Sequence, residues 1–144
     1  QLLYQVLGRA TRGHQNTKVV IQTASPSAHI IKYAVDRDYL AFYEKELADR
    51  KAFFYPPYCH MMIVHISRKT AKGAASAGTT VRQKISAEHR DVYVSPPLPD
   101  MTERVGLQYN WHLLVKSSKR SRLVDIAREL GTGYLCELDP IDTP

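Results

Sequence analysis

The sequence predicts an α+β domain over residues 56–144, in which two helices cover one face of a four-stranded antiparallel sheet. One observation is a segment in which apolar and polar residues alternate, as in a half-buried strand. The apolar positions of this segment are Leu107, Tyr109, Trp111, Leu113 and Val115, and the polar ones are Gln108, Asn110, His112 and Lys116. The other observation is the order of the elements around it, β-α-β-β-α-β, which is the split βαβ or ferredoxin-like arrangement.

The elements before the alternating strand follow from local signals. Cys59–Ser67 is rich in methionine, isoleucine and valine and predicts the first strand. Thr70 can cap a helix whose small and aliphatic residues recur on one face; these residues are Ala74, Gly78, Val81 and Ile85. Asp91–Ser95 predicts the second strand, and the prolines of residues 96–99 predict a loop.

The elements after the alternating strand complete the domain. Ser117 or Ser118 is expected to cap a second helix. The apolar residues that this helix should turn inward are Leu123, Ile126, Ala127 and Leu130. Gly131 and Gly133 should end the helix, and Tyr134–Leu138 predicts the last strand.

The chain before residue 56 predicts mainly helices and no complete sheet. Residues 1–12 predict a helix, and Val19–Ile21 predicts a short buried strand whose sheet partners lie outside this chain. Ser25 and Pro26 favour a helix start, with the helix running to about residue 36. The predicted division is therefore 1–36, a connecting helix over 37–55, and 56–144.

The connecting helix has its own pattern. Leu40, Tyr43 and Leu47 recur at helical spacing and predict a core-facing stripe. The helix should end at Tyr55–Tyr58, because residues before proline disfavour helical geometry.

Composition narrows the functional classes. The 144 residues carry a formal net charge of +6, which favours a polyanionic partner. The two cysteines are far apart without a Cys-x-x-Cys pair, so they predict reduced thiols rather than a zinc site. The histidines are scattered singly and predict no metal site; they are His14, His29, His60, His65, His89 and His112. No apolar run approaches a membrane span of about 20 residues.

Two groups of residues are candidates for binding anions. Gln5, Gly8, Arg9 and Arg12 form the pattern Gln-x-x-Gly-Arg-x-x-Arg, which brings two arginines to one helix face. The second group lies at the predicted start of the last helix and could contact phosphates or an acidic peptide; it comprises Lys116, Lys119, Arg120 and Arg122. For both groups the plainer alternative is a solvated helix end.

The first pattern resembles the last motif of superfamily 2 helicases, in which the two arginines reach the nucleotide phosphates held by the other motor lobe. Taken with further landmarks in the same order, the chain resembles the primosomal protein N′ family of bacterial replication-restart helicases. The landmarks are Arg50, Tyr55–Tyr58, Pro97–Pro99, Tyr109–Leu113 and Leu138–Pro140. Pro96 and Asp100 depart from the glycine and alanine that are usual in that family.

The resemblance implies the end of a RecA-like helicase lobe followed by a C-terminal domain similar to ribosomal protein S10. It implies a cytoplasmic parent with ATP-driven 3′-to-5′ unwinding, and ATP, Mg and Zn as cofactors of that parent. Its partners would be single-stranded and forked DNA, single-strand-binding protein and primosome proteins. No membrane is expected among its partners. Arg120 would receive the acidic tail of single-strand-binding protein.

This chain shows no phosphate-binding loop, so alone it should not hydrolyse ATP and should need no cofactor. The alternative is a non-enzymatic S10-like RNA- or protein-binding module. A cysteine or metal hydrolase is a third interpretation with little support in the sequence.

Overall fold

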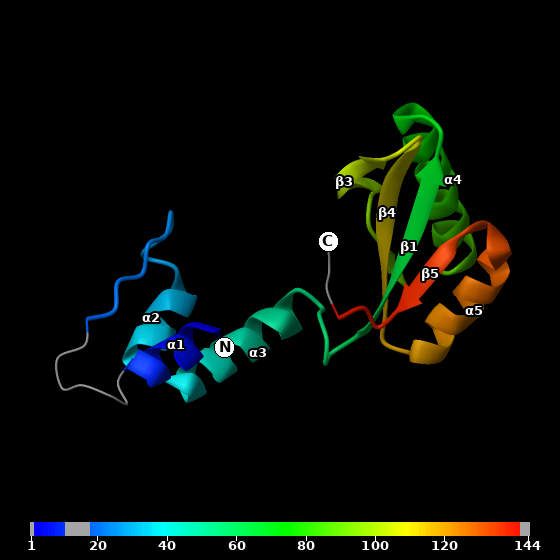
Figure 1. The fold of residues 1–144 in the computed structure, drawn as a ribbon. Helices are drawn as coiled ribbons and strands as arrows, with labels where there is room; N and C mark the ends of the chain where they lie inside the picture. The colour runs from blue at the N-terminus through cyan, green and yellow to red at the C-terminus, as the bar shows by residue number, and fades with distance from the viewer. Residues whose placement is uncertain (1, 11–17, 142–144) are drawn as a thin grey trace. The chain divides into compact units, whose positions relative to one another are not determined.

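The computed structural model describes residues 2–10 and 18–141 of the chain (Figure 1). The chain divides into two compact units, Gln1–Asp49 and Arg50–Pro144. The predicted boundaries after residues 36 and 55 stay predictions.

The larger unit is an α+β domain, as predicted. Its strands are β1 (His60–Arg68), β2 (Tyr93–Val94), β3 (Leu98–Val105), β4 (Gln108–Ser117) and β5 (Leu135–Leu138). Its helices after β1 are α4 (Ala71–Glu88), α5 (Arg120–Leu130) and the short 3₁₀ helix η1 (Gly131–Gly133). The sheet runs in the order β2-β4-β1-β5, with β3 also on β4, and the pairings are antiparallel. The prediction of four strands was therefore one strand short.

One face of the sheet carries the main core. Met62, Val64 and Ile66 of β1 alternate with residues that point the other way, and they pack with Leu113 and Val115 of β4. Helices α4 and α5 cover this face in Figure 1. The buried residues of α4 are Ala74, Gly78, Val81 and Ile85, and those of α5 are Leu123 and Ile126. The predicted inward faces of both helices are confirmed.

The predicted alternation holds along β4, but it begins later than expected. Tyr109 and Trp111 are partly buried and pack against the core. Leu107 is 80% exposed, because it lies in the turn before β4 and not on the strand. The indole Nε1–H of Trp111 donates to Glu103 Oε1 at 3.1 Å.

The helix ends follow local chemistry. Thr70 caps α4 as predicted, since its Oγ1 accepts the Gly73 N–H at 3.0 Å. The prediction for α5 was wrong: the N-cap is Lys119, with no side-chain cap hydrogen bond. Ser117 instead ends β4, is buried, and accepts the Lys119 N–H on its hydroxyl at 3.2 Å.

The largest correction concerns residues 93–105. The prolines of 96–99 predicted a loop, but β3 begins at Leu98, and both β2 and β3 lie along β4. The pairing register with β4 shifts between β2 and β3, and it shifts again within β3 between Pro99 and Arg104. Proline is tolerated here because an edge strand needs no outward N–H donor.

Gly78 gives a testable prediction about this edge. A Cβ at Gly78 would lie 2.5 Å from Pro97 Cβ and 3.2 Å from Ile66 Cδ1. We expect Gly78→Ala to destabilise the domain by about 1–3 kcal/mol through overpacking, despite alanine's better helix propensity. Chemical denaturation would measure this change, with Ser76→Ala on the exposed face of α4 as the control. A Gly78→Ala variant more stable than the wild type would show that the Pro97 segment yields easily.

The smaller unit contains α1 (Leu2–Ala10), α2 (His29–Asp36) and the first part of α3 (Tyr39–Ala52). Residues 18–23 have no regular structure in this chain. The strand predicted at Val19–Ile21 was expected to need sheet partners outside this chain, so it stays a prediction. No strand among the described residues pairs with this segment. The rest of the predicted first helix, residues 11–12, lies outside the described residues.

The helix starts also differ from the prediction. Ser25 begins a turn, accepting the Ala28 N–H on its carbonyl at 3.1 Å, and α2 starts three residues later than Pro26. Asp38 caps α3 by accepting the Ala41 N–H on Oδ1 at 2.9 Å. The predicted core-facing stripe of this helix is wrong, because Leu40 and Tyr43 are exposed.

Candidate nucleic-acid and partner interface

Three of the predicted cationic residues lie together at the start of α5. Lys119, Arg120 and Arg122 follow directly on β4, so the end of the strand fixes where they stand. Each arginine meets a carboxylate of another segment. Arg120 Nε donates to Asp139 Oδ2 at 2.8 Å, and Arg122 Nε donates to Asp91 Oδ2 at 3.1 Å. All four side chains of these two pairs are well exposed, so the pairs add little stability.

Asp139 is held in place from several sides. Its backbone adopts a positive φ of 49°, and its N–H donates to the Met61 carbonyl at 2.8 Å. The hydrogen bond from Arg120 is the main cause that lowers the pKa of the Asp139 carboxyl, and His60 at 3.5 Å contributes in the same direction. The chain thus places its own carboxylate on Arg120, in the way that an external carboxylate or phosphate would bind.

Lys116 does not belong with these three residues. It was predicted to contact phosphates, but it is only 6% exposed. Its Nζ donates to the Phe53 carbonyl at 3.2 Å and lies 3.4 Å from the centre of the Tyr55 ring. An ammonium enclosed in this way cannot also meet a nucleic-acid backbone, so we drop Lys116 from the interface.

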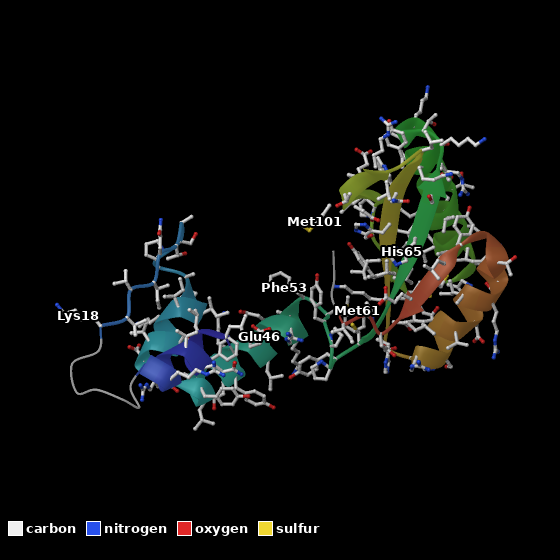
Figure 2. All side chains as sticks on the ribbon, in the orientation of Figure 1. Lys18, Glu46, Phe53, Met61, His65 and Met101 are labelled. Atoms are coloured by element: carbon white, nitrogen blue, oxygen red, sulfur yellow. The ribbon has the colours of Figure 1, made fainter. Side chains whose placement is uncertain are left out.

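The contacts of Lys116 with Phe53 and Tyr55 hold the segment after α3 against the sheet. Two further hydrogen bonds stabilise this segment. Cys59 Sγ donates to the Phe54 carbonyl at 3.1 Å, and Arg50 Nη1 donates to the Pro56 carbonyl at 3.1 Å. Phe53, at the start of this segment, and Met61, on β1 just after it, are labelled in Figure 2. These contacts could not be predicted from the sequence, because they depend on Lys116, which local patterning places on a solvated strand face.

Both thiols are poorly activated. Burial raises the pKa of Cys59, although the nearby Lys116 ammonium acts in the opposite direction. Burial likewise raises the pKa of Cys136. A raised pKa leaves little thiolate at neutral pH, so neither cysteine has the environment of a nucleophile.

The face of the sheet away from α4 and α5 carries an unpredicted row of polar residues. His65 of β1 (Figure 2) and His112 of β4 are directly opposite each other in the register. His65 Nε2 lies 3.4 Å from Glu137 Oε2, and His112 Nδ1 lies 2.6 Å from Asp100 Oδ1. Asp100 therefore has a local partner. The two histidines are distant in sequence, so only the pairing register brings them together.

A second unpredicted group joins the ends of two helices. Glu88, His89 and Glu129 bring one possible metal-ligand atom each to within 4.8 Å of one another. Glu88 and His89 are neighbours in sequence, but Glu129 is on α5. No spacing rule could have connected them.

The N-terminal motif is described only in part. Gln5 and Arg9 are exposed on α1, one helical turn apart, and a Cβ at Gly8 would meet nothing within 4 Å. No close packing within the described residues therefore requires a glycine at position 8. Arg12 lies outside the described residues, so its expected place beside Arg9 stays a prediction.

The family model of the primosomal protein N C-terminal domain matches residues 51–134. The chain belongs to this family. The match contains the whole sheet except its last strand, and it includes the basic start of α5. The α1 motif lies outside it.

Curated members of the family extend the similarity to almost the entire chain. Replication restart protein PriA of Thermotoga maritima is 33% identical over 144 residues, covering 97% of this chain. The Bacillus subtilis protein of that name is 29% identical over 96% of the chain, and the Chlamydia trachomatis protein is 32% identical over 99%. The chain spans 19%, 17% and 20% of these three relatives, about a fifth of their length.

Among solved structures, the designed protein Foldit4 covers 60% of the chain with a TM-score of 0.43 and 8% identity, which is too distant to bear on function. Among the described residues, none of the helices is long and apolar enough to cross a membrane.

Proposed function

We propose that this chain is the C-terminal part of an ATP-dependent 3′-to-5′ DNA helicase that acts in replication restart and primosome assembly. Membership of the primosomal protein N C-terminal domain family is the observation that supports this proposal most strongly. ATP hydrolysis, with ATP, Mg and Zn as cofactors, would belong to the complete protein in the cytoplasm. Residues 1–36 would belong to the end of its second RecA-like motor lobe.

The strand order supports the finer fold assignment. Without β3, the order β2-β4-β1-β5 and the two helices on one face fit a ferredoxin-like, S10-like domain. Such a fold hosts many functions, so the proposal rests on the family and the binding residues rather than on topology.

The proposed role of this domain is to bind anionic partners at the start of α5. Lys119, Arg120 and Arg122 are exposed or partly exposed there, on a helix end that favours negative charge. The candidate ligands are single-stranded or forked DNA and the acidic tail of single-strand-binding protein, with Arg120 receiving a tail carboxylate. Other primosome proteins would then assemble on the complete helicase.

Titration with single-stranded DNA and with an acidic tail peptide, each at two salt concentrations, tests this role. We expect DNA affinity to fall with salt with a slope of about −0.7 per phosphate neutralised. Lys119→Ala combined with Arg120→Ala should weaken binding, because both positive charges are lost. Arg82→Ala, which removes one exposed charge from α4, is the control.

Asp139→Asn sharpens the experiment. It removes the carboxylate that occupies Arg120, while asparagine tolerates the positive φ at this position. We expect this variant to bind both anionic ligands more tightly than the wild type. Unchanged binding in both the Asp139→Asn and the double variant would show that the start of α5 is only a solvated helix end.

The alternative function is a non-enzymatic S10-like module that binds RNA or protein. The exposed hairpin of β3 and β4 favours it, since Met101 (Figure 2) is 98% exposed and Leu98 and Val105 are more than half exposed. Tight binding of RNA over DNA in the same titration would support this alternative.

A further inference from the structure

The ends of α4 and α5 carry a group of side chains that neither the basic interface nor the N-terminal motif uses. His89 is the C-cap residue of α4, and its backbone N–H donates to the Ile85 carbonyl at 2.8 Å. His89 is 8% exposed, and its Nε2 lies 2.7 Å from Glu129 Oε2 on the last turn of α5.

Glu88 completes the group. Its carboxylate, His89 and Glu129 each offer one ligand atom, and the three atoms lie within 4.8 Å of one another. Metal–ligand distances of about 2.0–2.2 Å for zinc require ligand atoms to be roughly 3.4 Å apart. The carboxylates of Glu88 and Glu129 are on exposed residues. Rotation of their side chains can therefore shorten the distances between the ligand atoms to the value that the metal requires.

We propose that Glu88, His89 and Glu129 bind a divalent transition-metal ion. An imidazole nitrogen favours transition metals over Mg²⁺ and Ca²⁺, and two carboxylates supply the negative charge. Three protein ligands leave at least one position for water in a tetrahedral site. The ion would connect the end of α4 to the last turn of α5.

The surroundings limit the affinity of this site. Lys84 Nζ lies 3.5 Å from the Glu129 backbone carbonyl, and Arg90 follows His89 in sequence. The next charged pair, Arg122 with Asp91, is neutral overall. These nearby cations act against the two glutamates, so the site fits an exchangeable ion better than a permanent structural one.

A matched pair of histidine and glutamate elsewhere provides the control. His65 and Glu137 lie 3.4 Å apart on the sheet, and among the described residues they belong to no group of three such ligands. A histidine–carboxylate contact alone should not bind the ion well. The triad should bind it because of its third ligand.

The test is a calorimetric titration of the tag-free, metal-stripped 144-residue chain with Zn²⁺. We expect one ion per chain, and a loss of about tenfold or more in affinity for Glu88→Gln and for Glu129→Gln, since altering even an outer partner of a metal site costs that much. Glu137→Gln should bind like the wild type. Glutamine keeps the size of the side chain, and circular dichroism will verify that each variant is folded.

Three results would overturn the proposal. They are the absence of Zn²⁺ binding, equal affinity in the wild type and both triad variants, or an equal loss in Glu137→Gln. Titration with Co²⁺ tests the ligand type independently, because a thiolate-to-metal absorption band would place the ion on Cys59 or Cys136 instead.

Discussion

Replacing Arg9 or Arg12 by alanine in the complete helicase is expected to lower ATP turnover by about 10³–10⁵-fold for whichever residue acts as the arginine finger. The physical reason is that a guanidinium stabilises the charge that develops on the transferred phosphoryl group. Steady-state ATP hydrolysis with saturating single-stranded DNA measures the effect. The prediction rests on the proposed function, in which this chain holds only the end of the second motor lobe.

Two further variants test whether the guanidinium groups of the motif are what matters. Lys18→Ala removes an exposed positive charge outside the motif and should leave turnover unchanged. Arg12→Lys keeps the charge but loses the planar fork of donors, so it should recover little activity. If single alanine variants at positions 9 and 12 both retain full DNA-stimulated turnover, the motif has been misassigned.

Replacing Lys116 by alanine is expected to destabilise the larger unit by about 2–4 kcal/mol. Alanine removes most of the buried methylene stem, worth about 0.8 kcal/mol for each group. It also removes the contact of the ammonium with the Tyr55 ring and its hydrogen bond to the Phe53 carbonyl. Denaturant unfolding of the 144-residue chain measures the change.

Lys116→Met shows which part of the side chain matters. Methionine keeps much of the stem and avoids the cost of burying a charge, so we expect a change within about 1 kcal/mol of the wild type. Hydrogen exchange should nevertheless become faster over residues 53–58, because the anchoring contact is lost. If Lys116→Ala leaves stability unchanged while abolishing DNA binding, the lysine is a surface ligand after all, contrary to its burial here.

The helices could be predicted from the sequence because their signals are local. Thr70 and the spacing of Ala74, Val81 and Ile85 define α4 without reference to the rest of the chain. The strand β3 could not be predicted in this way, since prolines and charges hide any alternation. It exists because β4 offers it a partner and Gly106, with φ of 61°, makes the turn between them.

The candidate sites show the same limit. The basic start of α5 is contiguous in sequence, so the common location of Lys119, Arg120 and Arg122 could be predicted. Their binding role stays a prediction. Lys116 follows the strand alternation onto the polar face, but residues 53–55 cover that face at this point. The partner of His89 is Glu129, which lies far from it along the chain. The partner of His112 is Asp100, and their contact depends on strand register, which composition does not reveal.

The irregular edge formed by β2 and β3 leaves the sheet open to growth on one side only. Proline at positions 96, 97 and 99 removes three N–H groups along that edge, and the slips in register bend it. Among the described strands, β5 is the edge strand that offers a strand from another polypeptide a regular ladder, and its Leu135 is 70% exposed. Strand addition between two copies of this domain is accordingly expected to pair them through β5, with an irregular edge left on the outer side of each copy.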